Sequence, residues 1–173
     1  MNGLILLIPF FLIRFGLLLC LNKEAVKRAA HFAPLQGFEV IAYWIYQIFN
    51  IGIFVYLAFL KISDKMNWLS AFGLGCYLIG LVLCIVTMVN FSSPEGNGLN
   101  AKGLYKYSRN PMYLSYFICF VGMSILTKSI ILFCMVIVFQ MSSHWIILSE
   151  ERWCIERIGA DYKKYMKKVR RYF

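Results

Sequence analysis

Five apolar stretches, almost free of charged residues, divide the chain. They cover residues 4–21, 38–60, 68–89, 112–126 and 130–148. An α-helix rises about 1.5 Å per residue, and about 20 apolar residues cross the hydrocarbon core of a bilayer. The pattern therefore predicts an all-α fold with about five transmembrane helices. The fourth stretch has only 15 residues, so it falls short of a full crossing unless its ends are solvated or covered by protein.

The last two stretches are predicted to form a tight helical hairpin. Only Thr127, Lys128 and Ser129 separate them, and such short connections place consecutive helices antiparallel to each other. The following segment, 152–173, has apolar residues at steps of three and four with lysines between them. This spacing is typical of an amphipathic helix that lies on a membrane surface. It could serve as an anchor, as a lid over a site, or as both.

Composition supports a membrane protein of a single domain. Apolar residues make up 61% of the 173 residues and charged residues only 15%, and the mean hydropathy is +0.68. A soluble domain does not have this balance. The first stretch lacks a preceding basic residue and a small-residue cleavage motif, so we expect it to be retained and not to act as a signal peptide.

The basic residues predict the orientation in the membrane. Of the 18 lysines and arginines, three follow the first apolar stretch, three follow the third, and eight lie between 152 and 171. The opposite loops hold only Lys61, Lys65 and Lys128, while Arg14 interrupts the first stretch. The positive-inside rule then places the N-terminus outside and the C-terminus in the cytoplasm.

Other ligand classes are disfavoured by the same pattern. Most of the net charge of +10 lies beside membrane helices, where anionic headgroups explain it better than nucleic acid does. The six cysteines show no C-x-x-C pairing and have no histidines close to them, so neither a metal site nor a disulfide framework is indicated. No feature indicates the oligomeric state.

The loop of residues 90–110 is the longest polar segment inside the chain, and long loops in compact proteins are often functional. It starts with turn-forming residues at 92–98 and ends at Asn110-Pro111. Proline favours the first turn of a helix, so Asn110 is the expected N-cap. With Arg109 beside it, this helix start could bind a carboxylate or phosphate. Alternatively, Arg109 could simply extend to lipid phosphates. The glycines lack the strand and helix of a dinucleotide-binding motif.

A polar stripe runs along the fifth apolar stretch. Gln140, His144 and Glu151 are four and seven residues apart, so they share one helical face. Polar groups inside a membrane helix usually face a cavity or a partner. We therefore predict a pocket beside them, although His144 could be a packing residue and the Glu150-Glu151 pair a solvated helix end.

The C-terminal 70 residues contain an ordered set of motifs. They are Gly103-x-Tyr105-x-x-x-Arg109-Asn110-Pro111-x-Tyr113, then His144, Glu150-Glu151, and Ile158-Gly159-x-x-Tyr162-x-x-Tyr165-x-x-x-Val169-Arg170-Arg171. This set resembles the membrane methyltransferases that include isoprenylcysteine carboxyl methyltransferase and the phospholipid (phosphatidylethanolamine) N-methyltransferases. The isoprenylcysteine branch typically has Arg-His-Pro where this chain has Arg109-Asn110-Pro111.

The resemblance implies a single methyltransferase domain over 1–173, with a three-helix part at 1–89 and a cofactor-binding part at 90–173. It implies S-adenosyl-L-methionine as cofactor, bound between the last two helices, the polar loop and the C-terminal segment. The residues implied around the cofactor are Gly103, Leu104, Tyr105, Asn110, Pro111, His144 and Glu150. Those implied nearer the reacting groups are Arg109, Tyr113 and Glu151.

The implied acceptor is a lipid-soluble molecule, either a phospholipid amine or an isoprenylcysteine-like carboxylate or thiol. For an amine, Glu151 or His144 could accept the proton, and for a carboxylate Arg109 could orient the anion. Aromatic residues such as Tyr105, Tyr107, Tyr113 and Tyr116 could hold a sulfonium by cation–π attraction, or could be ordinary interfacial tyrosines. A membrane sterol-type reductase and a non-catalytic membrane scaffold remain alternatives.

Overall fold

The protein is helical, as the apolar pattern predicts. A computed structural model describes residues 1–63, 67–94 and 98–172, and these contain no β-strand beyond two isolated bridges. Residues 95–97 of the predicted turn segment, Lys65 and Phe173 lie outside the described residues. The α-helices are α1 (Leu7–Phe11), α2 (Leu18–Leu21), α3 (Lys23–Ala30), α4 (Phe38–Phe59), α5 (Trp68–Ser92), α6 (Pro111–Leu126), α7 (Ile130–Ile158) and α8 (Ala160–Lys168).

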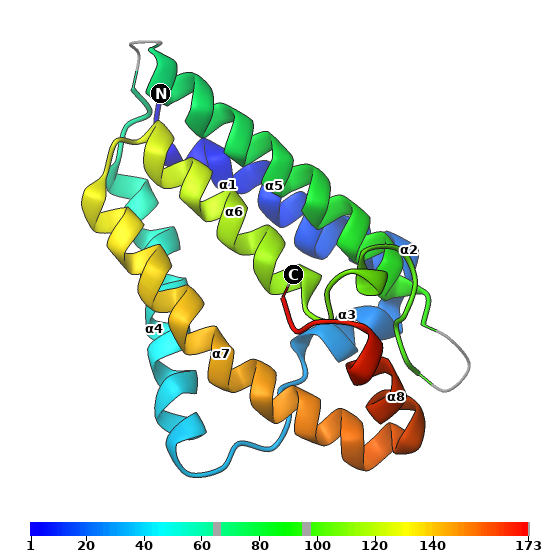
Figure 1. Ribbon diagram of the computed structural model, residues 1–173. Helices are drawn as coiled ribbons and strands as arrows, with labels where there is room; N and C mark the ends of the chain where they lie inside the picture. The colour runs from blue at the N-terminus through cyan, green and yellow to red at the C-terminus, as the bar shows by residue number, and fades with distance from the viewer. Residues whose placement is uncertain (64–66, 95–97, 173) are drawn as a thin grey trace.

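Among the described residues, four helical segments are long and apolar enough to cross a membrane: Gly3–Leu21, Phe38–Phe59, Trp68–Ser92 and Ile130–Ile158. The fifth expected segment, α6, has 16 residues and is shorter than the others. Its length corresponds to roughly 24 Å, so the predicted count of five crossings is not confirmed. In Figure 1, α6 and α7 meet at their hairpin and diverge toward the opposite end, while α5 runs beside α6.

Each end of the bundle is held together by its own hydrogen bonds. At one end, Gly3 N donates to the Leu60 carbonyl at 2.8 Å, and Ser63 N donates to the Leu126 carbonyl at 3.0 Å. At the other end, the Asn22 side chain donates to the Ser92 carbonyl at 2.9 Å. The second end also carries α3, the polar loop and α8 (Figure 1). The basic clusters counted in the sequence therefore gather at one end of the bundle.

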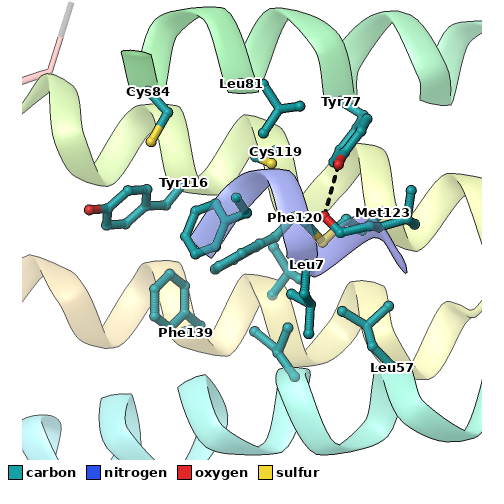
Figure 2. Packing of buried hydrophobic residues seen from close by; sticks show 14 of the residues in the cluster. Leu7, Leu57, Tyr77, Leu81, Cys84, Tyr116, Cys119, Phe120, Met123 and Phe139 are labelled. Atoms are coloured by element: carbon teal, nitrogen blue, oxygen red, sulfur yellow. Dashed lines mark hydrogen bonds between the residues drawn. The ribbon is translucent and has the colours of Figure 1, made fainter. Parts of the chain in front are cut away.

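Glycines bring α5 and α6 into very close contact. A Cβ built on Gly80 would lie 2.6 Å from the Cα of Cys119, and one on Gly122 would collide with the backbone of Tyr77. Small residues allow membrane helices to approach through van der Waals contact where no hydrophobic effect drives them together. Around this contact, Figure 2 shows buried side chains such as Phe120 and Phe139, and the Tyr77 hydroxyl donating to the Leu6 carbonyl at 2.8 Å.

Gly80→Ala is expected to destabilise the protein because the added methyl group must push α6 away. Overpacking of this kind costs roughly 1–3 kcal/mol. Gly75→Ala is the matched control on the same helix: nothing lies within 4 Å of its Cβ position, and alanine favours a helix by about 1 kcal/mol over glycine. Thermal unfolding in detergent should show a lower midpoint for Gly80→Ala only. Equal midpoints would contradict the close contact.

The C-terminal region differs from the single amphipathic helix predicted over 152–173. Helix α7 continues through Ile158, so Glu150 and Glu151 lie inside it and not at its end. The chain then turns at Gly159, whose φ of 72° is unfavourable for other residues. Helix α8 covers only Ala160–Lys168, with Tyr162 and Tyr165 buried. The prediction missed this turn because the helical apolar spacing continues on both sides of the glycine.

The first apolar stretch is also less regular than predicted. A 3₁₀ turn at Gly3–Leu6 leads into α1, and a π-helical segment at Leu12–Leu17 separates α1 from α2. π-Helical turns inside α-helices are rare and frequently occur at functional sites. This one contains Arg14, the charge that interrupts the apolar pattern.

Candidate functional site

A cavity of about 740 Å³ lies at the polar end of the bundle. Its walls come from the first helical segment, α3, the polar loop and helices α4, α5, α6, α7 and α8. Its size falls in the usual range of small-molecule sites, about 300–1,000 Å³. The predicted site residues that line it are Tyr105, Arg109, Asn110, Tyr113, Glu150 and Glu151.

Glu151 is the centre of a charge cluster in the cavity wall. Its Oε1 lies 2.8 Å from Nη2 of Arg109, and its Oε2 lies 2.8 Å from Nη2 of Arg171. The side chains of Glu151 and Arg109 are only 5% and 8% exposed, whereas that of Arg171 is 31% exposed. The pKa of Arg171 is raised, chiefly by the hydrogen bond to Glu151. The sequence predicted Arg109 and Glu151 as site residues but did not indicate that they contact each other.

The C-terminal segment returns to the start of α6 and completes this cluster. The Arg109 N–H donates to the Arg170 carbonyl at 3.0 Å, next to a parallel bridge between Ser108 and Arg170. Asn110 is at the N-cap position and Pro111 is the first helical residue, as predicted. However, the Asn110 side chain does not cap the helix: its Nδ2 donates to the Arg171 carbonyl at 3.1 Å. Asn110 thus connects two segments distant in sequence.

Gly103 explains why the polar loop can approach α5. Its φ is 55°, and a Cβ at this position would collide with the side chain of Asn90. The following Tyr105 is buried in the cavity wall, and its carbonyl accepts a hydrogen bond from the Tyr165 hydroxyl at 2.6 Å. Burial raises the pKa of Tyr105. Gly103 itself does not line the large cavity, while Leu104 and Pro111 line a separate small pocket.

Tyr113 and Glu150 form the second polar pair of the cavity. The Tyr113 hydroxyl donates to Oε1 of Glu150 at 2.8 Å. Tyr46 and Tyr116 also line the cavity, so both α4 and α6 contribute aromatic rings to its wall. Of the four tyrosines considered for cation binding, Tyr107 is 70% exposed and lies outside the cavity lining.

The polar stripe on α7 faces two different surroundings. Glu151 lines the cavity, but His144 does not, and its Nδ1 lies 2.7 Å from the Tyr172 hydroxyl. Burial raises the pKa of Tyr172. Gln140 has a buried Oε1 without a hydrogen-bond partner among the described residues. His144 and Glu151 therefore both contact the returning C-terminal segment, one at Tyr172 and the other at Arg171.

Several cavity residues were not predicted. Among them are Arg14, Lys27, Arg28, His31, Tyr46, Asn100, Trp153 and Arg157. Only Arg14 had a visible indication in the sequence, as a charge inside an apolar stretch. Glu39 pairs with Arg152 at 2.6 Å and so connects α4 to α7.

Buried polar atoms in this wall lack partners within the described part of the chain. They are Nε of Arg109, Oδ1 of Asn100 and the hydroxyl oxygen of Tyr116. Buried polar groups are nearly always hydrogen-bonded, so each such exception needs a physical reason. A polar ligand in the cavity would supply partners for all three kinds of group: a guanidinium donor, an amide acceptor and a hydroxyl. No group of three or more metal-ligating side chains occurs among the described residues.

Together, the apolar helices define an integral membrane protein with a polar cavity at one end of its helical bundle. Residues 68–161 match the family Phospholipid methyltransferase. The chain belongs to this family, and its resemblance to membrane methyltransferases is confirmed. The match begins at Trp68 and so includes α5, which precedes the motif set of the C-terminal 70 residues. No curated protein and no solved structure matches the chain.

Proposed function

We propose that the protein is an S-adenosylmethionine-dependent methyltransferase that acts on a lipophilic acceptor. The family membership supports a membrane methyltransferase. The observation that carries the proposal is the cavity itself, because its charged wall is built from Arg109 and Glu151 of the motif set that the family resemblance picked out. The acceptor belongs to one of two classes, a phospholipid amine or an isoprenylcysteine-like carboxylate or thiol.

The cavity wall offers suitable groups for this cofactor. S-adenosylmethionine supplies an electrophilic methyl group on a cationic sulfonium. Carboxylates such as Glu150 can balance cationic or amino groups, guanidinium groups such as Arg109 can bind a carboxylate, and the aromatic rings can stack on the adenine or face the sulfonium. The unpartnered Nε of Arg109 and Oδ1 of Asn100 are the further groups we expect to contact it.

We propose separate roles for the residues nearest to the reacting groups. Both oxygens of Glu151 are bonded to guanidinium groups, so this residue fixes Arg109 in the wall and connects it to Arg171 of the C-terminal segment. Glu150 accepts a bond from Tyr113, which orients a carboxylate that faces the cavity. For an amine acceptor, Glu150 is therefore better placed than His144 to receive the proton, since His144 lies outside the cavity lining.

We propose that Gly103, Pro111 and His144 support the site from outside the cavity lining. Gly103 permits the loop's close approach to Asn90, Pro111 starts α6, and His144 holds the C-terminal segment through Tyr172. Catalysis of methyl transfer depends mainly on positioning the reactants and excluding water. These supporting residues serve that purpose without touching the cavity. We further propose that the cavity end faces the cytoplasm, since the basic clusters lie there.

Calorimetric titration of the detergent-purified protein with S-adenosylhomocysteine tests the proposal. Saturable binding at one site is expected, and NADPH should produce no heat of binding. Transfer of a labelled methyl group from S-adenosylmethionine into a lipid extract should then identify the acceptor class. If protein shown to be folded binds NADPH and not S-adenosylhomocysteine, the reductase alternative replaces this proposal. If it binds neither, the scaffold alternative does.

A further inference from the structure

Arg14 is the most unusual charge in the molecule. It lies in the middle of a membrane-spanning segment, seven residues before the end of α2, and therefore roughly 10 Å below that end. A charged residue at such a depth is costly unless it faces a cavity or pairs with another group, and it usually marks a functional site. Arg14 lines the large cavity.

The direct contacts of Arg14 are with uncharged groups, and its charge interacts with that of Glu150 without forming an ion pair. One Nη donates to the Ala29 carbonyl at 3.1 Å, and the other lies 3.6 Å from the sulfur of Met112 and 4.0 Å from that of Met88. The guanidinium carbon lies 5.3 Å from the centre of the Tyr116 ring. Arg14 forms no ion pair with any carboxylate in the described part of the chain.

This differs from the other arginines near the site. Arg109 and Arg171 share the carboxylate of Glu151, and Arg152 pairs with Glu39. Arg14 is partly buried, and a cation in such a place is unfavourable without a paired anion, because the lowered dielectric penalises an isolated charge. A ligand that carries an anion would remove this penalty at Arg14.

Tyr116 provides a second, independent indication. It is only 6% exposed, and its hydroxyl has no hydrogen-bond partner among the described residues. Buried tyrosine hydroxyls usually find one. Tyr116 lines the same cavity, and in Figure 2 its hydroxyl points away from Phe120 and the rest of the apolar cluster. The Tyr116 hydroxyl and the Arg14 guanidinium are thus two hydrogen-bond donors that face one cavity.

We propose that Arg14 and Tyr116 bind an acidic group carried by the lipid acceptor, with phosphate as the best match. A guanidinium forms short charge-assisted bonds to phosphate, and the tyrosine hydroxyl can donate a further bond to it. Arg28 and Lys27 line the same cavity from α3, so the charge along its wall is positive from α3 down to Arg14. An acidic headgroup would be drawn below the membrane surface toward Glu150 and Tyr113. This inference rests on the proposed function, because it names a specificity determinant of the same site.

The test compares two lipids that differ in one group: dihexanoyl phosphatidic acid and dihexanoylglycerol, which lacks the phosphate. Binding to the detergent-purified full chain is measured by calorimetry. The wild type should bind the phosphate lipid at least tenfold more tightly. Arg14→Gln should weaken that binding by about tenfold to a hundredfold, the range for hydrogen bonds to charged groups. Arg14→Lys should retain part of it, and Tyr116→Phe, which leaves the packing unchanged, should lose several-fold.

Two controls distinguish a phosphate site at Arg14 from a general effect of positive charge and from a site for the cofactor carboxylate. Lys167→Gln removes one positive charge from an exposed side chain of α8 at the same end of the bundle and outside the cavity lining, and it should leave lipid binding unchanged. The affinity for S-adenosylhomocysteine should stay within twofold in all Arg14 and Tyr116 variants. If Arg14→Gln instead weakens S-adenosylhomocysteine and leaves phosphatidic acid unaffected, Arg14 serves the cofactor carboxylate and the inference is wrong.

The failures of the two proposals are distinguishable. Equal binding of both lipids, or phosphate-lipid binding that is the same in the wild type and in Arg14→Gln and Tyr116→Phe, overturns the role of Arg14 while S-adenosylhomocysteine binding still supports a methyltransferase. Conversely, Arg14-dependent binding of phosphatidic acid in a protein that does not bind S-adenosylhomocysteine keeps the anion site and removes the proposed function.

Discussion

Glu151→Gln is expected to reduce cofactor binding and methyl transfer by more than a hundredfold, the largest effect of any single substitution in the site. The carboxylate holds two guanidinium groups, Arg109 and Arg171, and its side chain is only 5% exposed. Glutamine keeps the shape but removes the charge, which leaves two arginines without their counter-ion. Removing one partner of a buried ion pair destabilises the surrounding structure by roughly 3–5 kcal/mol, so Arg109 should no longer be held in place. A displacement of about 1 Å in a site can lower the rate by about a hundredfold.

The measurement is calorimetric titration with S-adenosylhomocysteine, together with transfer of a labelled methyl group. Glu156→Gln is the matched control, since Glu156 is an exposed acid on the same helix five residues further along. It should behave like the wild type. Thermal unfolding of Glu151→Gln should show a lower midpoint than that of the wild type. Its transition should remain cooperative, which would demonstrate that the variant is folded. A folded Glu151→Gln variant with full activity would remove the charge cluster from the site.

Periodicity and helix-end rules predicted the parts of this fold that depend on local sequence. The long apolar stretches became helices, Pro111 began α6 as its fixed backbone requires, and the short connection at Lys128 produced the α6–α7 hairpin. These features follow from a few neighbouring residues and from the solvent around them. For the same reason the helix limits were less accurate where a single residue decided them, as at Gly159.

The contacts that build the site could not be predicted, because they join residues far apart in the chain. Arg109 and Glu151 come from different elements, and Asn110 meets the Arg171 carbonyl 61 residues later. The sequence assigned Asn110 a capping role because asparagine is a good N-cap. In the folded chain its side chain instead donates a hydrogen bond to the backbone of the returning C-terminal segment. Arg14 was visible as a charge in the membrane, but the cavity that it faces depends on how all the helices pack.

The polar stripe on α7 shows both the value and the limit of such reasoning. Its spacing indicated that His144 and Glu151 share a face and require polar surroundings. Part of these polar surroundings comes from the C-terminal segment of the chain itself: Tyr172 contacts His144, and Arg171 contacts Glu151. Polar groups on a membrane helix can be satisfied by another segment of the same chain as well as by a pocket. The pattern on one helix does not distinguish these two cases.

Truncation of the chain after Lys168 is expected to lower methyl transfer by more than a hundredfold while the membrane helices remain folded. The deletion removes the Arg170 carbonyl that accepts from the Arg109 N–H, the Arg171 guanidinium at Glu151, and the Tyr172 hydroxyl at His144. It also removes Val169, which is buried with Leu99 and two tyrosines of α8. Because Arg109 and Glu151 would lose their support together, the wall of the cavity should no longer be fixed.

A graded series of variants tests whether these contacts act together. Tyr172→Phe removes only the bond to His144 and should lower turnover less than threefold. Arg171→Ala should lower it about tenfold, since its side chain is partly solvated and its bonds to Glu151 are screened. Arg170→Gln should change nothing, because its exposed side chain is replaced while its carbonyl, the atom that contacts Arg109, remains. Turnover is measured with labelled S-adenosylmethionine, and folding by thermal unfolding in detergent. If the truncated protein turns over like the wild type, the C-terminal segment is not part of the site, and Glu151 must hold Arg109 without it.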